Sequence, residues 1–253
     1  MELLALPPAI LAYAALAVFA AAFVRGYSGF GSSMIWVSSL TIVLPPAEVV
    51  PMVLLFEIAA SLGLLPAVWR EVAWRSLGWI VLGTVLATPL GVYALAALPA
   101  DVIRLAIAAV VIVATLLIWR GRSFHGGSGA LPAVATGLGA GFLNGSTGAG
   151  GPPVVLFYFG SSAAVAVGRA SIIAYFLASD TLGTAFMAGQ GLVTAEVLLR
   201  TALALPLVGL GIWLGHRGFR RSDPVRFKRL VLLLLIALSL ALIARTLWAA
   251  TQA

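Results

Sequence analysis

Long apolar segments follow one another along almost the whole chain, separated by short polar connectors. Because about 20 apolar residues in a helix span the hydrocarbon core of a bilayer, this pattern predicts a polytopic helical membrane protein. The segments of this length divide evenly between the two halves of the chain. We expect long helices at residues 8–26, 47–68, 77–97, 101–119, 130–145, 164–188, 195–215 and 227–247.

Two shorter apolar pieces, 32–44 and 151–160, lie between the first and second long segments of each half. They are too short for a standard crossing, so we interpret them as half-helices or as steep short crossings. The expected fold is therefore all-α, with two homologous halves built from eight long helices and two short membrane segments. A first transmembrane repeat covers 1–122, a polar linker 123–129 and a second repeat 130–253.

The residues before the two short pieces resemble each other. Residues 23–31 read FVRGYSGFG and residues 142–150 read FLNGSTGAG, so three glycines, the leading Phe and a small hydroxyl residue match at a constant offset of 119. A glycine-rich break at matching places in two hydrophobic halves points to the binding site of a transporter. The pattern predicts an internal duplication with a polar site at the two breaks.

Lys and Arg gather in the connectors at 70–75, 120–122 and 216–229. If the short pieces cross the membrane, each half has five crossings and all three connectors lie on one side, as the positive-inside rule favours. If the short pieces only re-enter, the third connector faces the opposite side from the first two. The charge pattern thus favours two inverted halves with both termini outside.

Composition supports a membrane protein, because the chain is 62% hydrophobic and only 9% charged. The absence of cysteine excludes disulfides and thiolate metal sites, and the two histidines, His125 and His216, lie in polar connectors. We therefore expect no metal site and no cofactor. The net charge of +7 is concentrated in the connectors, so we expect no nucleic-acid partner. Without an HExxH, GxSxG or Asp-rich metal motif, the chain is not expected to be an enzyme.

Arg25 lies near the end of an apolar run with no neighbouring charge in the sequence. An arginine in hydrocarbon faces a cavity, a partner or water. Its planar fork suits the oxygens of a sulfonate, carboxylate or phosphate, which makes it a candidate cation for an anionic substrate. Alternatively, it extends to the interface or pairs with an internal acid. Asn144 takes the matching place in the second half.

The glycines of both breaks permit local unwinding, after which the unpaired N–H groups of a new short helix would favour an anion. The alternative is that these glycines serve only the close packing of helices. Hydroxyl groups in the breaks add hydrogen-bond donors. The candidate substrate-binding residues are Arg25, Gly26, Ser28, Gly29, Gly31, Ser32, Asn144, Gly145, Ser146, Thr147, Gly148 and Gly150.

Glu57 and Asp180 also lie in apolar surroundings. Either acid can carry a coupling proton, or it can be the counter-charge of Arg25. If that pairing is permanent, the substrate must bind elsewhere. Tyr175, Ser179 and Gln190 are plausible polar neighbours.

The second break, read as GFLNGSTGAGGPP over residues 141–153, together with the first break and the two-half plan, resembles the sulfite exporter TauE/SafE family over nearly the whole chain. The resemblance implies a multi-pass permease of a prokaryotic inner membrane for small, often sulfur-containing anions such as sulfite or sulfoacetate. The two halves differ, because Arg25 replaces Asn144 and Ser32-Ser33-Met34 replaces Gly151-Pro152-Pro153.

We therefore expect a secondary transporter for a small anion, with the lipid bilayer as its surroundings and H⁺ as a possible coupling ion. Export driven by the membrane potential alone is equally compatible with the sequence. No nucleotide-binding motif is present in the sequence. An anion channel lined by the same residues is the first alternative, and a membrane assembly partner without a substrate is the second. The sequence leaves open the substrate, the direction, the stoichiometry and the oligomeric state.

Overall fold

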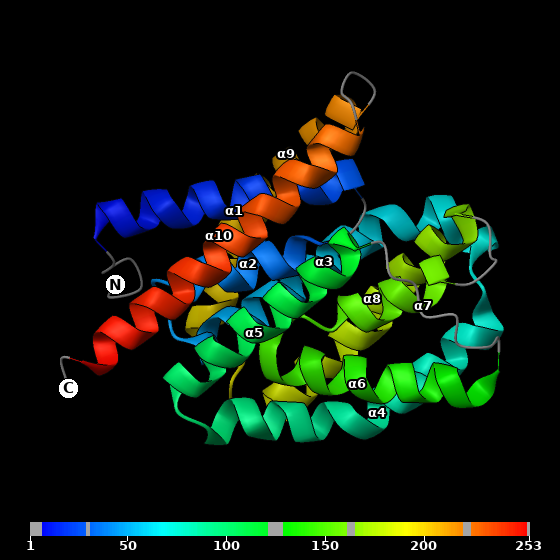
Figure 1. Cartoon of the computed structure of the whole chain (residues 1–253), viewed down its shortest axis with the longest axis horizontal. Helices are drawn as coiled ribbons and strands as arrows, with labels where there is room; N and C mark the ends of the chain where they lie inside the picture. The colour runs from blue at the N-terminus through cyan, green and yellow to red at the C-terminus, as the bar shows by residue number, and fades with distance from the viewer. Residues whose placement is uncertain (1–6, 29–30, 121–128, 161–164, 220–223, 252–253) are drawn as a thin grey trace.

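The computed structural model describes residues 7–28, 31–120, 129–160, 165–219 and 224–251. These residues form ten α-helices and one short 3-10 turn, η2, and they contain no β-strand (Figure 1). The elements are α1 (Pro8–Ser28), α2 (Ser32–Leu40), α3 (Pro46–Val68), η2 (Trp69–Glu71), α4 (Trp74–Ala97), α5 (Ala100–Trp119), α6 (Ala130–Thr147), α7 (Gly151–Gly160), α8 (Val165–Gly189), α9 (Ala195–Phe219) and α10 (Pro224–Ala250).

The expected division into long and short helices is confirmed within the described ranges. α2 has 9 residues and α7 has 10, whereas the others have between 18 and 27. Seven of the long helices have the length and hydropathy needed to cross a membrane, and the glycine-rich α6 is not among them. The chain is therefore a multi-pass membrane protein.

Some boundaries differ from the expected ones. α2 ends at Leu40 rather than at residue 44, because the chain turns over residues 41–44 before Pro45 and Pro46, and a residue that precedes proline avoids the helical region. α4 begins at Trp74, three residues earlier than expected. The polar connector expected at 216–229 is largely helical: α9 reaches Phe219 and α10 starts at Pro224, a residue that suits the first turn of a helix. Of the linker expected at 123–129, all but Gly129 lies outside the described residues.

The two halves repeat the same order of helices. α1 to α5 match α6 to α10 as long, short, long, long and long elements. The first break separates Ser28 from Ser32 and the second separates Thr147 from Gly151, so both breaks fall at the offset of 119 found in the sequence.

The helix contacts between the two halves are reciprocal. α4 packs on α6, and α9 packs on α1, so the fourth helix of each half lies against the first helix of the other. At the centre, α3 of the first half packs on α8 of the second. Leu54 of α3 lies beside Gly183 of α8, whereas the Ala73 N–H beyond the end of α3 donates to Ser171 Oγ near the start of α8. The two equivalent helices therefore run in opposite directions.

Glycines allow the helices of these paired contacts to approach closely. A Cβ on Gly145 of α6 would lie 2.6 Å from the Thr88 carbonyl oxygen of α4, and a Cβ on Gly26 of α1 would lie 2.1 Å from the Ile212 carbonyl oxygen of α9. Such distances leave no room for any side chain. Both halves thus use a break glycine to bring a helix of the other half against the break.

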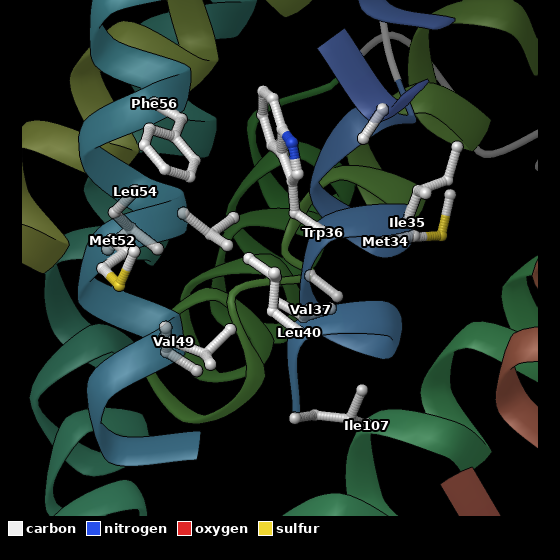
Figure 2. Packing of buried hydrophobic residues seen from close by; sticks show 14 of the residues in the cluster. Met34, Ile35, Trp36, Val37, Leu40, Val49, Met52, Leu54, Phe56 and Ile107 are labelled. Carbon is white, nitrogen blue, oxygen red and sulfur yellow. The ribbon is translucent and has the colours of Figure 1, made fainter. Parts of the chain in front are cut away.

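The core around the first break is formed by α2 and α3. All nine residues of α2 are buried. A surface helix exposes one polar face, so burial on all sides places α2 inside the bundle. Figure 2 shows Trp36 and Leu40 of α2 and Phe56 and Leu54 of α3 packed in one cluster. The Trp36 and Phe56 ring centroids are 5.3 Å apart, and the Trp36 indole N–H donates to the Val18 carbonyl 3.1 Å away. α2 is therefore held firmly on both α1 and α3.

Candidate functional site

Arg25, three residues before the end of α1, is the charged residue around which the first break is organised. Its side chain is fully buried, and its Nη1 lies 3.0 Å from Oε2 of Glu57 on α3. Its Nη2 donates to Ser61 Oγ, one helical turn further along α3, at 3.1 Å. Glu57 is also buried and stands halfway along α3. The sequence alternative of an internal counter-charge is thus realised, with Glu57 as the partner.

Glu57 is held from a second side by α2. Ser32, the first residue of α2, donates its hydroxyl to Glu57 Oε1 at 2.5 Å. The carboxylate therefore lies at the N-terminal end of a helix, where free N–H groups and the helix dipole favour negative charge. One carboxylate thus receives a guanidinium, a hydroxyl and a helix N-terminus, three groups that together favour an anion.

The second half contributes an aromatic face to the same arginine. The Arg25 guanidinium carbon lies 4.9 Å from the centroid of the Phe176 ring on α8, within the range of a cation–π contact. Arg25 Nε has no hydrogen-bond partner among the described residues. Buried polar atoms normally have a hydrogen-bond partner. This N–H is therefore an unused donor inside the bundle.

At the second break, Asn144 of α6 takes the place of Arg25. Its Nδ2 donates to Oδ1 of Asp180 on α8 at 2.9 Å, and Ser179 Oγ approaches the same oxygen at 3.3 Å. Asn144 and Asp180 are each only 1% exposed. Asp180 is close enough to Arg25 and Glu57 to interact electrostatically with both. The two breaks therefore contribute to one buried polar cluster, which we call the inter-break cluster: Arg25, Ser32, Glu57, Ser61, Asn144, Ser179 and Asp180.

The two hydrogen bonds from the breaks occupy matching positions. In each hydrogen bond the donor and the acceptor are 36 residues apart: Arg25 donates to Ser61, and Asn144 donates to Asp180. At the offset of 119, Ser61 corresponds to Asp180 and Glu57 corresponds to Phe176. Sequence reasoning missed Ser61 and Phe176, although applying that offset to the two acids would have pointed to both.

Among the break glycines, Gly31 and Gly148 have left-handed backbones, with φ of 89° and 67°. Gly31 is the N-cap of α2, and Gly148 is the C-cap of α6, where its N–H donates to the Asn144 carbonyl. Glycine takes these conformations without steric cost, so these two residues form the breaks. Gly150 lies against Ala140 and Asn144, and Gly26 and Gly145 lie against α9 and α4 as described above.

The remaining candidates are less directly placed. Ser146 and Thr147 donate their hydroxyls to carbonyls of their own helix, those of Phe142 and Leu143. The side chain of Ser28 and all of Gly29 lie outside the described residues. Of the expected polar neighbours, Ser179 and Tyr175 are buried beside Asp180, whereas Gln190 is exposed at the end of α8.

No group of three or more potential metal ligands is found in the described part of the chain. An open pocket of about 590 Å³ lies at the end of α3 and over η2, where Leu62, Trp69 and Arg70 contribute to its lining. It contains no residue of the inter-break cluster. The cluster itself is sealed from solvent in this conformation.

Comparison with known proteins agrees with this architecture. The family model of the sulfite exporter TauE/SafE matches residues 14–242, a range that contains both breaks and the whole inter-break cluster. The chain belongs to the sulfite exporter TauE/SafE family.

One curated relative is the "Probable sulfite/organosulfonate exporter TauE" of Cupriavidus necator (strain ATCC 17699 / DSM 428 / KCTC 22496 / NCIMB 10442 / H16 / Stanier 337). This TauE/SafE chain is 29% identical to it over 107 residues, a stretch that covers 42% of each protein. The chain thus matches less than half the length of that relative. No solved structure matches the chain.

Proposed function

We propose that this chain is a secondary transporter that moves a small sulfur-containing anion, sulfite or an organosulfonate such as sulfoacetate, across the inner membrane. The observation that carries the proposal is the environment of Glu57. A carboxylate is held between the Arg25 guanidinium and the Ser32 hydroxyl at the N-terminus of α2. A sulfonate or sulfite has the oxygens and the negative charge that this environment favours.

In this proposal, the substrate binds to Arg25 by taking over part of the coordination that Glu57 occupies in the sealed conformation. The free Nε of Arg25 offers an additional donor to a substrate oxygen. Because Arg25, Glu57, Asn144 and Asp180 are all at most 1% exposed, a substrate reaches them only after the helices move. Alternating opening to the two sides of the membrane supplies that movement.

The relation between the halves supports the same mechanism. The helices α3 and α8, each the third of its half, run antiparallel. The fourth helix of each half packs on the first helix of the other. Both features are expected of inverted repeats, in which the substrate site lies at the interface of the repeats near the bilayer midplane. They also favour the five-crossing topology, since four crossings per half would make α3 and α8 parallel.

Ligand-induced thermal shifts of purified protein test the binding site. The wild type is compared with Glu57→Gln and with the charge-balanced double variant Arg25→Gln/Glu57→Gln, using sulfite, sulfoacetate, sulfate and phosphate as ligands. We expect Glu57→Gln to show larger shifts with sulfite or sulfoacetate than the wild type, because the competing carboxylate is gone. The double variant is expected to show none. Equal shifts in all three proteins would contradict a substrate site at Arg25.

Transport in proteoliposomes separates the proposed function from its alternatives. If the protein is a transporter, proteoliposomes loaded with unlabelled sulfoacetate exchange it for labelled sulfoacetate in a saturable counterflow. An anion channel gives conductance without counterflow, and an assembly partner gives neither. Saturable counterflow that is lost in Arg25→Gln/Glu57→Gln is the result expected of the proposed function.

A further inference from the structure

The two buried carboxyl groups of the inter-break cluster have different partners. Glu57 faces the positive charge of Arg25. Among the described residues, Asp180 accepts hydrogen bonds only from uncharged donors, the Asn144 amide at 2.9 Å and the Ser179 hydroxyl at 3.3 Å, and both approach Oδ1. Its second oxygen, Oδ2, is buried and has neither a hydrogen-bond nor an ion-pair partner among the described residues. Oε2 of Glu57 also lacks a hydrogen bond, but it lies 3.0 Å from the Arg25 guanidinium. A buried ionised carboxylate normally has a hydrogen-bond or ion-pair partner for each oxygen.

The charges of the cluster balance without Asp180. Arg25 and Glu57 form a neutral pair, so an ionised Asp180 would leave a net negative charge in a dry interior. Burying an unpaired ion costs several kcal/mol, and the neighbouring Glu57 carboxylate adds repulsion. A neutral Asp180, with a proton on the otherwise unpartnered Oδ2, avoids both costs.

Among the described residues, the titratable and charged groups around Asp180 supply no cation beyond Arg25, which already pairs with Glu57. Those that act on it are Glu57 of α3, Arg25 of α1 and Tyr175 of its own helix. α6 contains no charged residue. The charged residues that α4 and η2 contribute to the bundle, Arg70, Glu71 and Arg75, are exposed at helix ends, and Tyr158 of α7 bonds instead to Ser76.

We propose that Asp180 is the proton-carrying residue of this transporter, and that Glu57 is not. The proposal rests on the proposed transport function and assigns its coupling ion and site. In the sealed conformation Oδ2 holds a proton. When the cluster opens to water, the O–H bond breaks and the proton passes to a water molecule. It is regained from water on the other side, so anion movement is linked to proton movement without any further reactant.

Infrared spectroscopy tests the protonation of Asp180 independently of transport. In an ester-free detergent near neutral pH, a protonated carboxyl group gives a C=O stretching band that a carboxylate lacks. We expect this band in the wild type and in Glu57→Gln, and its loss in Asp180→Asn. In Asp180→Glu the band should remain at a shifted frequency. A band that persists unchanged in Asp180→Asn, or that is absent from the wild type, would overturn the assignment.

Transport with sulfoacetate tests the coupling, because the charge of this anion does not change near neutral pH. The wild type should show both counterflow and accumulation driven by a pH gradient. Asp180→Asn should lose the accumulation, and the counterflow that remains should no longer depend on pH, whereas Asp180→Glu should retain pH-driven accumulation. Gradient-driven accumulation by Asp180→Asn, or accumulation driven by Na⁺ and not by pH in the wild type, would overturn the proposal. If the wild type shows no counterflow, the proposed function fails and the coupling fails with it, while the infrared band still reports the state of Asp180.

Asparagine is a suitable replacement, because its Oδ1 still accepts the Asn144 hydrogen bond and its amide nitrogen imitates the protonated oxygen. Asp180→Asn is therefore expected to fold with a Tm close to that of the wild type. A large loss of Tm in Asp180→Asn together with a normal Tm in Asp180→Glu would show that the negative charge itself is required, which contradicts a neutral Asp180.

Discussion

Ser61 and Asp180 lie 119 residues apart, the same offset that separates the two breaks, and each accepts a hydrogen bond from the polar residue near the end of the first helix of its half. The donor is the charged Arg25 in one half and the neutral Asn144 in the other. The acceptors differ in the opposite sense, a neutral hydroxyl in the first half and a carboxyl group in the second. The two breaks thus share the geometry of the pair but differ in its charge distribution.

The Arg25–Glu57 pair is expected to dominate the stability of the first break. Glu57→Gln leaves a buried guanidinium without its counter-charge, which costs about 3–5 kcal/mol. Ser61→Ala removes a hydrogen bond to the same guanidinium and should cost about 1–3 kcal/mol. The measurement is the Tm of each purified variant without added anions. A Glu57→Gln variant as stable as Ser61→Ala would show that the ion pair is not the main restraint on Arg25.

The contact between α4 and α6 depends on Gly145 having no side chain. A Cβ at this position would lie 2.6 Å from the Thr88 carbonyl oxygen, so Gly145→Ala must separate two backbones and should lower stability by about 1–3 kcal/mol. Gly139 is the matched control on the same helix, because nothing lies within 4 Å of its Cβ position. Gly139→Ala is expected to leave the Tm unchanged or slightly raised. Equal effects of the two variants would refute the packing role.

The second break depends on the left-handed backbone of Gly148. Gly148→Ala introduces a strained conformation and also places a Cβ 3.0 Å from Val37 Cγ1 on α2. Gly191 has a similar φ of 72° with nothing within 4 Å, so Gly191→Ala reports the backbone strain alone, about 1–2 kcal/mol. The thermal unfolding difference between the two variants then measures the crowding at the break. We expect Gly148→Ala to be the less stable of the two and to reduce counterflow.

The absence of cysteine allows the topology to be tested by labelling single introduced thiols. Arg70, Asp101, Gln190 and His216 are all exposed near helix ends. With five crossings per half, Arg70→Cys and His216→Cys react with a membrane-impermeant maleimide from one side, and Asp101→Cys and Gln190→Cys react from the other. Four crossings per half would place Arg70→Cys and His216→Cys on opposite sides. Labelling in intact cells and in inverted vesicles distinguishes the two arrangements.

Much of the site was predictable because its elements repeat. The glycine breaks, the candidates Arg25 and Asn144, and the candidate acids Glu57 and Asp180 all follow from polar residues and glycines in apolar sequence, where few polar groups are expected. The choice of partner was not predictable. The sequence allowed either Glu57 or Asp180 to be the counter-charge of Arg25. Phe176 is one apolar residue among many, so no local pattern marked it as a contact of Arg25.

What the sequence by itself determined is the class and the order of elements: a helical membrane protein in which the order of long and short helices occurs twice, each time with one glycine-rich break. Hydropathy and periodicity decide this, because a bilayer admits few structures. The tertiary structure alone decided that Arg25 forms its ion pair with Glu57, while Asp180 has no ion-pair partner among the described residues. That assignment depends on how α1, α3, α6 and α8 are arranged in space, which brings Arg25 to Glu57 and Asn144 to Asp180. Coulombic and hydrogen-bond energies depend on such distances, and no local pattern in the chain records them.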